Sequence, residues 1–232
     1  MATYFETTNI DAKVVVVDDT FVNLRFIAKY SVNINIVGPF GQNFRTGTLN
    51  INNVINPVVA IKTGSLGVCL FKMVLETNGS YTYYFQAGAA NVDTIITVYV
   101  FDYSSVQGNY GLQTFDATGK LVFDSSMRYM KVVGIATFAN YETAVLPTLP
   151  IGNYAYVVSG AFCEIEDYHD AYETGEAFAV TNIWRYMLQS TTTGAIGKVE
   201  NVFNMRTSIG NTSPFNNSIR AGSILFIDVA GL

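Results

Sequence analysis

The sequence predicts an all-β protein built as two small antiparallel β-sandwich-like domains in tandem. Three observations support this fold class: a long alternating run from Val22 to Ile36, short apolar runs separated by Gly, Asn and Pro, and no segment with a convincing helical period. Tyr168 to Val180 comes nearest to a helical period, but Gly175 interrupts it, so a loop or an irregular strand pair is expected there. Short strands between frequent turns favour sandwiches or barrels over a βαβ plan.

The alternating run is the clearest local signal. Its apolar positions recur every second residue, and polar residues lie between them, with Ile27 as the single exception. Such alternation predicts one face in a core and the other toward solvent or a neighbouring chain. It indicates one long strand, or two short strands joined by a bulge.

Further strands are expected on both sides of a break at Tyr103 to Asn109, which is rich in Ser and Gly. We place a domain boundary there, giving an N-terminal β domain of residues 1–105 and a C-terminal β domain of residues 106–232. The last expected strand is apolar on both faces, which predicts a central buried strand. The expected strands are Val58 to Lys62, Val68 to Leu75, Tyr81 to Gln86, Ile95 to Phe101, Tyr129 to Phe138, Tyr154 to Cys163, Ala177 to Leu188, Lys198 to Met205 and Ser223 to Val229.

The second half opens with a predicted hairpin between Gly111 and Asp124. Asp116 at the first turn position and Gly119 at the fourth fit a type I turn between the two strands. The apolar residues of the hairpin are expected to supply packing; they are Leu112, Phe115, Leu121 and Phe123.

The composition indicates a protein that meets other protein. Half of the 232 residues are hydrophobic, and only 13% are charged, against a usual share of about 25%. Tyr and Phe occur 15 and 16 times. Interface cores lose charge and gain aromatic residues, so this balance favours an assembly component, with a homo-oligomer as the expected form.

Several classes of partner are excluded by charge and hydropathy. The net charge is −5 and no Lys/Arg cluster is visible, so no nucleic-acid partner is expected. The first twelve residues lack the pattern of a signal peptide, and the longest apolar runs fall far short of the ~20 residues that span a bilayer. We therefore expect synthesis in a cytoplasm and no stable membrane insertion. Cys69 and Cys163 form either one disulfide or, as we favour, two buried thiols.

One acidic stretch and one histidine are the only candidates for chemistry. The stretch from Glu164 to Glu176 has a carboxylate density that suits Ca²⁺, but it lacks the ordered spacing of a calcium loop, and the alternative is a solvated loop. His169 is the only histidine, which excludes multi-histidine zinc sites, and no Gly-x-Ser-x-Gly elbow accompanies it. Trp184 is expected in a core rather than as a sugar platform or interface anchor. No enzyme activity, catalytic residue, cofactor or metal ligand is predicted.

The polar face of the alternating run is a predicted interface. It carries two cations, several amides and Ile27, where a solvated face of this length would usually hold more charge. Amides contact a partner at lower desolvation cost than ions, and Ile27 would act as an apolar anchor. The alternative is an ordinary solvated sheet face. The predicted interface residues are Asn23, Arg25, Ile27 and Lys29, continuing through Ser31, Asn33 and Asn35.

The hairpin carries a resemblance to a known family. Its residues Gly111, Leu112, Gln113, Phe115 and Asp116, followed by Gly119, Phe123, Asp124 and Ser125, resemble an uncharacterised family of tailed-bacteriophage tail-region proteins, associated with the tail tip or fibres. The resemblance covers roughly residues 10–135. It implies a structural protein of the virion, with other virion proteins and symmetry copies as partners, and it supplies no catalytic residues. The alternative is a β-sandwich module that binds a host receptor or a carbohydrate.

Overall fold

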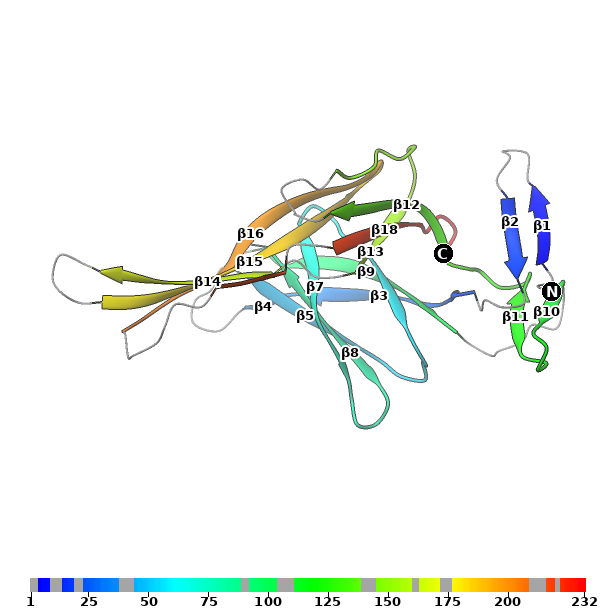
Figure 1. The fold of residues 1–232 in the computed structure, drawn as a ribbon, viewed down its shortest axis with the longest axis horizontal. Coiled ribbons are helices and arrows are strands. Elements are labelled where there is room, and N and C mark those ends of the chain that lie inside the picture. The colour runs from blue at the N-terminus through cyan, green and yellow to red at the C-terminus, as the bar shows by residue number, and fades with distance from the viewer. Residues whose placement is uncertain are drawn as a thin grey trace.

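The computed structural model describes residues 4–8, 14–18, 23–37, 44–88, 92–103, 111–138, 145–159, 163–171, 177–208, 216–219 and 222–232 (Figure 1). The described part contains strands and no helix, which confirms the predicted all-β class. Its strands are β1 (Tyr4–Thr8), β2 (Val14–Asp18), β3 (Arg25–Ile34), β4 (Ile36–Val37), β5 (Arg45–Ile51), β6 (Val58–Lys62), β7 (Val68–Leu75), β8 (Tyr81–Ala87), β9 (Thr94–Asp102), β10 (Gln113–Phe115), β11 (Leu121–Asp124), β12 (Lys131–Phe138), β13 (Tyr154–Ser159), β14 (Cys163–Ala171), β15 (Ala177–Thr191), β16 (Gly194–Ser208), β17 (Asn216–Ile219) and β18 (Gly222–Asp228).

Two large antiparallel sheets make up the body of the fold. The six-stranded sheet has the order β12-β18-β13-β6-β9-β3. The eight-stranded sheet has the order β17-β14-β15-β7-β8-β5-β4, with β16 paired to β15. Two further two-stranded sheets are formed by β1 with β2 and by β10 with β11. The far ends of β14, β15 and β16 extend beyond the rest of the sheets, on the left of the view (Figure 1).

The predicted tandem arrangement is corrected by this topology. In the six-stranded sheet β13 pairs with β6, and in the eight-stranded sheet β15 pairs with β7. Each large sheet therefore takes strands from both sides of residue 105, and residues 1–105 and 106–232 are not two separate sandwiches. Most of the predicted linker, residues 104–110, lies outside the described residues. Local periodicity reports where strands occur but not which distant strands they pair with, so the sequence could not reveal this interleaving.

The predicted alternating strand is present, and it contains a bulge. The register of β3 on β9 shifts between Phe26 and Ala28, which places the bulge at Ile27. From Lys29 to Ile34 exposed and covered residues alternate, and Val32 and Ile34 are buried. After Asn35 the chain leaves this sheet, and β4 pairs with β5 in the other sheet. The run is thus two strands in two sheets, which is close to the second form predicted.

The main core lies between the two large sheets. It combines Val32, Ile61 and Val98 of the six-stranded sheet with Phe85 and Leu188 of the eight-stranded sheet, all almost fully buried. Inward-facing residues of both sheets share this cluster, so the fold is one sandwich.

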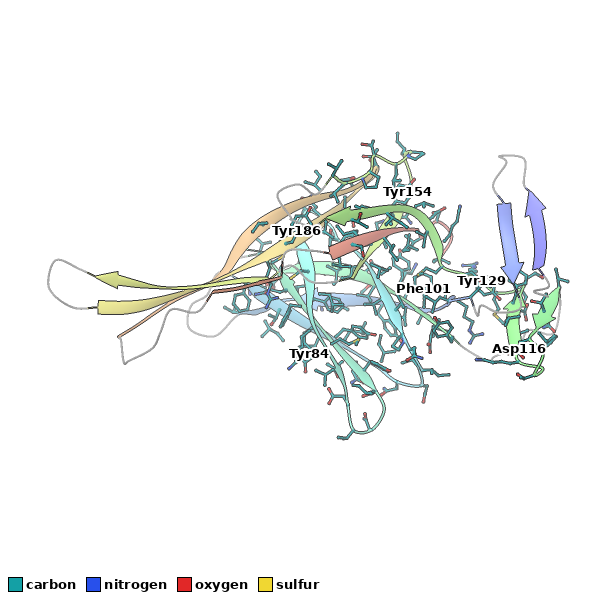
Figure 2. The ribbon with its side chains drawn as sticks, viewed as in Figure 1. Tyr84, Phe101, Asp116, Tyr129, Tyr154 and Tyr186 are labelled. Carbon is teal, nitrogen blue, oxygen red and sulfur yellow. The ribbon has the colours of Figure 1, made fainter. Side chains whose placement is uncertain are left out.

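A second core covers the opposite face of the six-stranded sheet. Tyr99, Phe101 and Ile227 are buried there, with Phe26 and Leu232 packed against them. Phe101 is labelled in Figure 2. β18 contributes Phe226 to the main core and Ile227 to the second core, and it lies between β12 and β13. The prediction of a central strand that is apolar on both faces is confirmed.

The eight-stranded sheet has a narrow joint between β15 and β7. Only one residue pair, Leu188 with Val68, is in register between these strands. Tyr156, from the opposite sheet, has its hydroxyl 2.7 Å from the Leu188 carbonyl oxygen and 3.2 Å from the Val68 carbonyl oxygen. Thr63 and Ser190 add a reciprocal pair, since each backbone N–H donates to the hydroxyl of the other. Burial raises the pKa of Tyr156 well above its ordinary value, so its hydroxyl stays protonated and can donate.

The strand predictions were accurate for several elements and missed others. β6 and β7 have the predicted bounds, while β1, β2, β5 and β17 were not predicted. For Tyr168 to Val180 a loop or an irregular strand pair was expected, and the strand pair is present, since Tyr168 in β14 is in register with Val180 in β15. The solvated loop considered for the acidic stretch is not formed by residues Cys163 to Ala171, which make up β14 and pair with both β15 and β17. Asp and Glu are depleted in strands, but pairing on both edges overrides that propensity here.

Candidate interaction surfaces

The turn of the β10–β11 hairpin is built as predicted. The N–H of Gly119 donates to the Asp116 carbonyl oxygen at 3.0 Å, and Gly119 has a φ of 82°. The Asp116 carboxylate accepts from the Thr118 hydroxyl at 2.7 Å and from the backbone N–H groups of Thr118 and Lys120. These bonds, led by that from the Thr118 hydroxyl, lower the pKa of Asp116. The Asp116 side chain therefore fixes the turn, at the right-hand end of the view in Figure 2.

Two apolar residues of this hairpin do not pack as expected. Leu112 is 49% exposed and Phe115 is 44% exposed. Phe123 does pack, since its ring stacks on Tyr129 with centroids 5.2 Å apart. The three-residue strand β10 is too short to form a buried face, so the prediction of packing for Leu112 and Phe115 is wrong and that for Phe123 is confirmed.

Gly111 begins the hairpin motif in a conformation that favours glycine. Its φ is 101°, and a Cβ atom there would lie 2.3 Å from the Ser125 hydroxyl oxygen. That hydroxyl accepts from the Leu112 N–H at 2.8 Å. Gly111 is therefore structural, as its place in the motif suggested.

Asp124 is a fully buried acid that organises the end of the hairpin. Its carboxylate accepts from the Gln113 amide at 2.9 Å, the Ser126 N–H at 2.8 Å and the Ser126 hydroxyl at 2.6 Å. The Tyr129 hydroxyl forms hydrogen bonds with both backbone groups of Asp124: it accepts from the Asp124 N–H at 2.5 Å and donates to the Asp124 carbonyl oxygen at 3.0 Å. These bonds join residues of the hairpin and of the turn that follows it, so Asp124 holds this end of the hairpin together.

Asp102 is a second buried acid, and no sequence pattern predicted its role. Its carboxylate accepts from the backbone N–H groups of Ile55 and Asn56 at 2.7 and 2.8 Å, and from that of Tyr103. It thus holds the turn before β6 against the end of β9. In the part of the chain that the structure describes, the carboxylates of both buried acids accept hydrogen bonds from backbone N–H groups or nearby side chains.

The predicted interface on β3 is partly used within the chain. Ile27 is half-buried and packs against the main core, because the bulge turns it inward, so its predicted role as an exposed anchor is wrong. Arg25 is half-buried and contacts the Met127 sulfur at 3.6 Å. Lys29 donates to the Leu232 carbonyl oxygen at 2.9 Å. Asn23 is half-buried and lies two residues before the start of β3. That this face contacts another chain stays a prediction.

The acidic stretch has its backbone in place, but its side chains lie outside the described residues. Glu164 and Glu166 are in register with Trp184 and Asn182 of β15. The predictions for the side chains of Cys163, His169 and Trp184, and for calcium, fall outside the described side chains, and residues 172–176 lie outside the description altogether. The described residues contain no cluster of His, Cys, Asp and Glu suited to a metal ion. Cys69, on β7, is a buried thiol.

The outer face of the eight-stranded sheet carries a ladder of cations and aromatic rings. Arg185 lies over the Phe71 ring, with its Cζ 5.3 Å from the centroid. The Phe71 and Tyr84 centroids are 6.1 Å apart, and the Lys72 Nζ lies 5.2 Å from the centroid of Tyr84. We call Phe71, Lys72, Tyr84 and Arg185 the cation–aromatic face; Tyr84 marks it in Figure 2.

The cation–aromatic face meets one requirement of a carbohydrate-binding site and does not meet another. Thr48 and Thr82 lie in register beside Tyr84 and Val74, so hydroxyl groups flank the rings. However, a sugar platform needs a bare ring face, and here Lys72 and Arg185 lie over the two rings.

Exposed apolar side chains occur in pairs on four separate elements. Such residues are normal when single, and a pair on one element exposes more apolar surface than a single residue does. The pairs are Ile36 and Val37 on β4, Met73 and Leu75 on β7, Val92 and Ile95 at the start of β9, and Val132 and Ile135 on β12.

Comparisons with known proteins gave no match. No family model, no curated protein and no solved structure matches it. Within the described residues, no helix is long and apolar enough to cross a membrane.

Proposed function

We propose that this chain is a structural protein of a tailed-bacteriophage virion, placed at the tail tip or in association with a fibre. It acts through protein–protein interfaces with other virion proteins and with copies of itself, and it is not an enzyme. It is synthesised in the host cytoplasm and ends in the virion.

The observation that carries this proposal is the paired exposed apolar residues on β4, β7, β9 and β12. These strands lie in both large sheets, so the apolar pairs are spread over several faces. Burying them against partners removes apolar surface from water, at about 25 cal/mol per Å². A chain with one ligand site would need only one such patch.

The use of the buried acids supports the same conclusion. The carboxylates of Asp102 and Asp124 accept hydrogen bonds from backbone and nearby side-chain donors, which gives both buried acids a structural role. The hairpin motif that resembles the phage family is likewise structural, because Asp116 and Gly119 make its turn. The proposed function therefore depends on the exposed surface of the chain rather than on its buried acids or its hairpin.

The test is the protein content of purified virions from a phage that carries this gene. Mass spectrometry should find the chain at a fixed copy number in washed particles, and at a multiple of three or six if it lies on the tail axis. If the chain is abundant in the lysate of infected cells and missing from the washed particles, the proposed function is wrong.

A further inference from the structure

The cation–aromatic face is a positive site in an acidic chain. Lys72 is exposed, and Arg185 is half-buried beside it across Phe71. Among the described side chains, the ion pairs are Arg45 with Asp93 and Lys131 with Asp228, and neither involves this face. On the neighbouring strand β16, Glu200 is in register with Arg185.

The strands on the other side of the face leave its charge unopposed. No Asp, Glu, Lys or Arg occurs between residues 46 and 61 or between residues 77 and 92, which include all of β8 and most of β5. These strands add Thr48, Asn50 and Thr82 to the outer face. β5 and β8 thus add neutral polar side chains beside Lys72, and a partner that binds there does not have to desolvate further ions on these two strands.

The opposite charge is concentrated on β14. Its nine residues include four acids, Glu164, Glu166, Asp167 and Asp170, and no Lys or Arg. Its neighbour β17 is uncharged. By strand alternation, Glu164, Glu166 and Asp170 fall on one face of the sheet. β14 also belongs to the part that extends beyond the body (Figure 1).

Within one chain these two elements cannot meet. β14 and β7 lie in the same sheet and both pair with β15, at Cys163–Ala171 and at Val68. A strand cannot fold onto the face of the sheet to which it belongs. The β14 of a second copy has no such restriction.

We propose that the cation–aromatic face binds the acidic β14 strand of a second copy of this chain. The contact joins two different surfaces, so it is heterologous and leads to rings or open helical stacks. The proposal deepens the proposed function, on which it rests, by naming one partner of the assembly. Lys72 and Arg185 meet the carboxylates of β14, and Phe71 and Tyr84 hold the two cations in place from beneath.

The experiment is sedimentation velocity of the purified full chain at 50 and 500 mM salt. The wild-type chain should self-associate, and more weakly at high salt. Lys72→Glu should weaken the association at least tenfold. The matched control is Lys120→Glu, which makes the same charge change on the exposed β10–β11 turn and should leave association unchanged.

A mixing test separates charge complementarity from general destabilisation. Glu164→Gln with Glu166→Gln should also weaken self-association, with circular dichroism unchanged. A mixture of this variant with Lys72→Glu should form a 1:1 complex, because each partner then supplies one intact surface. A wild-type chain that stays monomeric, equal effects of Lys72→Glu and Lys120→Glu, or no complex in the mixture would each overturn the proposal.

Two other outcomes are also decisive. If Lys72→Glu leaves self-association intact but abolishes retention on an anionic polysaccharide, the face binds a glycan and the proposal is wrong. If the wild-type chain is absent from virions, the proposed function is wrong. If the chain is present in virions but Lys72→Glu does not change its sedimentation, only the proposed β14 contact is wrong.

Discussion

Tyr156→Phe tests the joint that unites the eight-stranded sheet. The change removes one hydroxyl and no other atom, and that hydroxyl lies 2.7 and 3.2 Å from two carbonyl oxygens on either side of the joint. The hydroxyl is fully buried, so water cannot replace it, and a lost buried hydrogen bond costs about 1–3 kcal/mol. For a chain of this size, a loss of about 2 kcal/mol lowers Tm by roughly 4–8 °C.

The assay is urea unfolding, followed by hydrogen exchange of peptides that cover Val68 and Leu188. We expect a lower midpoint with an unchanged slope, and faster exchange at the joint than in β9. Tyr154→Phe is the matched control, because its hydroxyl donates to the Pro150 carbonyl oxygen at 2.7 Å and spans no strand joint. Stability of Tyr156→Phe within 0.5 kcal/mol of wild type, or exchange raised equally throughout the chain, would refute the role given to this hydroxyl.

Three further predictions concern the hairpin and β3. Gly119→Val should cost about 1–3 kcal/mol through its positive φ alone, since nothing lies within 4 Å of the added Cβ, and an unchanged Tm would contradict this. Thr118→Val should raise the pKa of Asp116, measured by NMR titration, because the Thr118 hydroxyl bond lowers that pKa in the folded chain. The stabilisation from the ionised Asp116 is present above the pKa of the unfolded chain and is lost as the pH falls through the pKa of the folded chain. An unchanged pKa in the variant would show that the Thr118 bond does not contribute. Ile27→Asp should destabilise the isolated chain by about 1–3 kcal/mol, because Ile27 packs on the main core, whereas a change below 0.5 kcal/mol would restore it to an exposed face.

Local patterns predicted much of the fold. The alternation through Val32 and Ile34 predicted both the strand and its buried face. Asp116 and Gly119 predicted the turn, since few residues meet its backbone requirements. The strand face and the turn each depend on residues close together in the chain, so they are visible in one sequence, whereas the position of the bulge at Ile27 was not predicted.

The features that depend on distant parts of the chain were not predicted from the sequence. The pairing of β13 with β6 and of β15 with β7 joins residues that are about a hundred positions apart, and no local signal specifies it. The same holds for the site. The cation–aromatic face depends on Arg185 reaching Phe71 from another strand, while Asp102 gained its role from a turn some 46 positions earlier in the chain.

An electron cryo-microscopy map of the intact particle tests the central claim most directly. The account predicts density for this fold in the tail, with the outer face of the eight-stranded sheet and the exposed residues of β4 and β12 buried against neighbouring chains. It also predicts β14 of one copy seated on Lys72 and Arg185 of the next. A particle map without this fold, or one in which the chain is present with both large sheets facing solvent, would contradict the claim that it works through protein–protein interfaces.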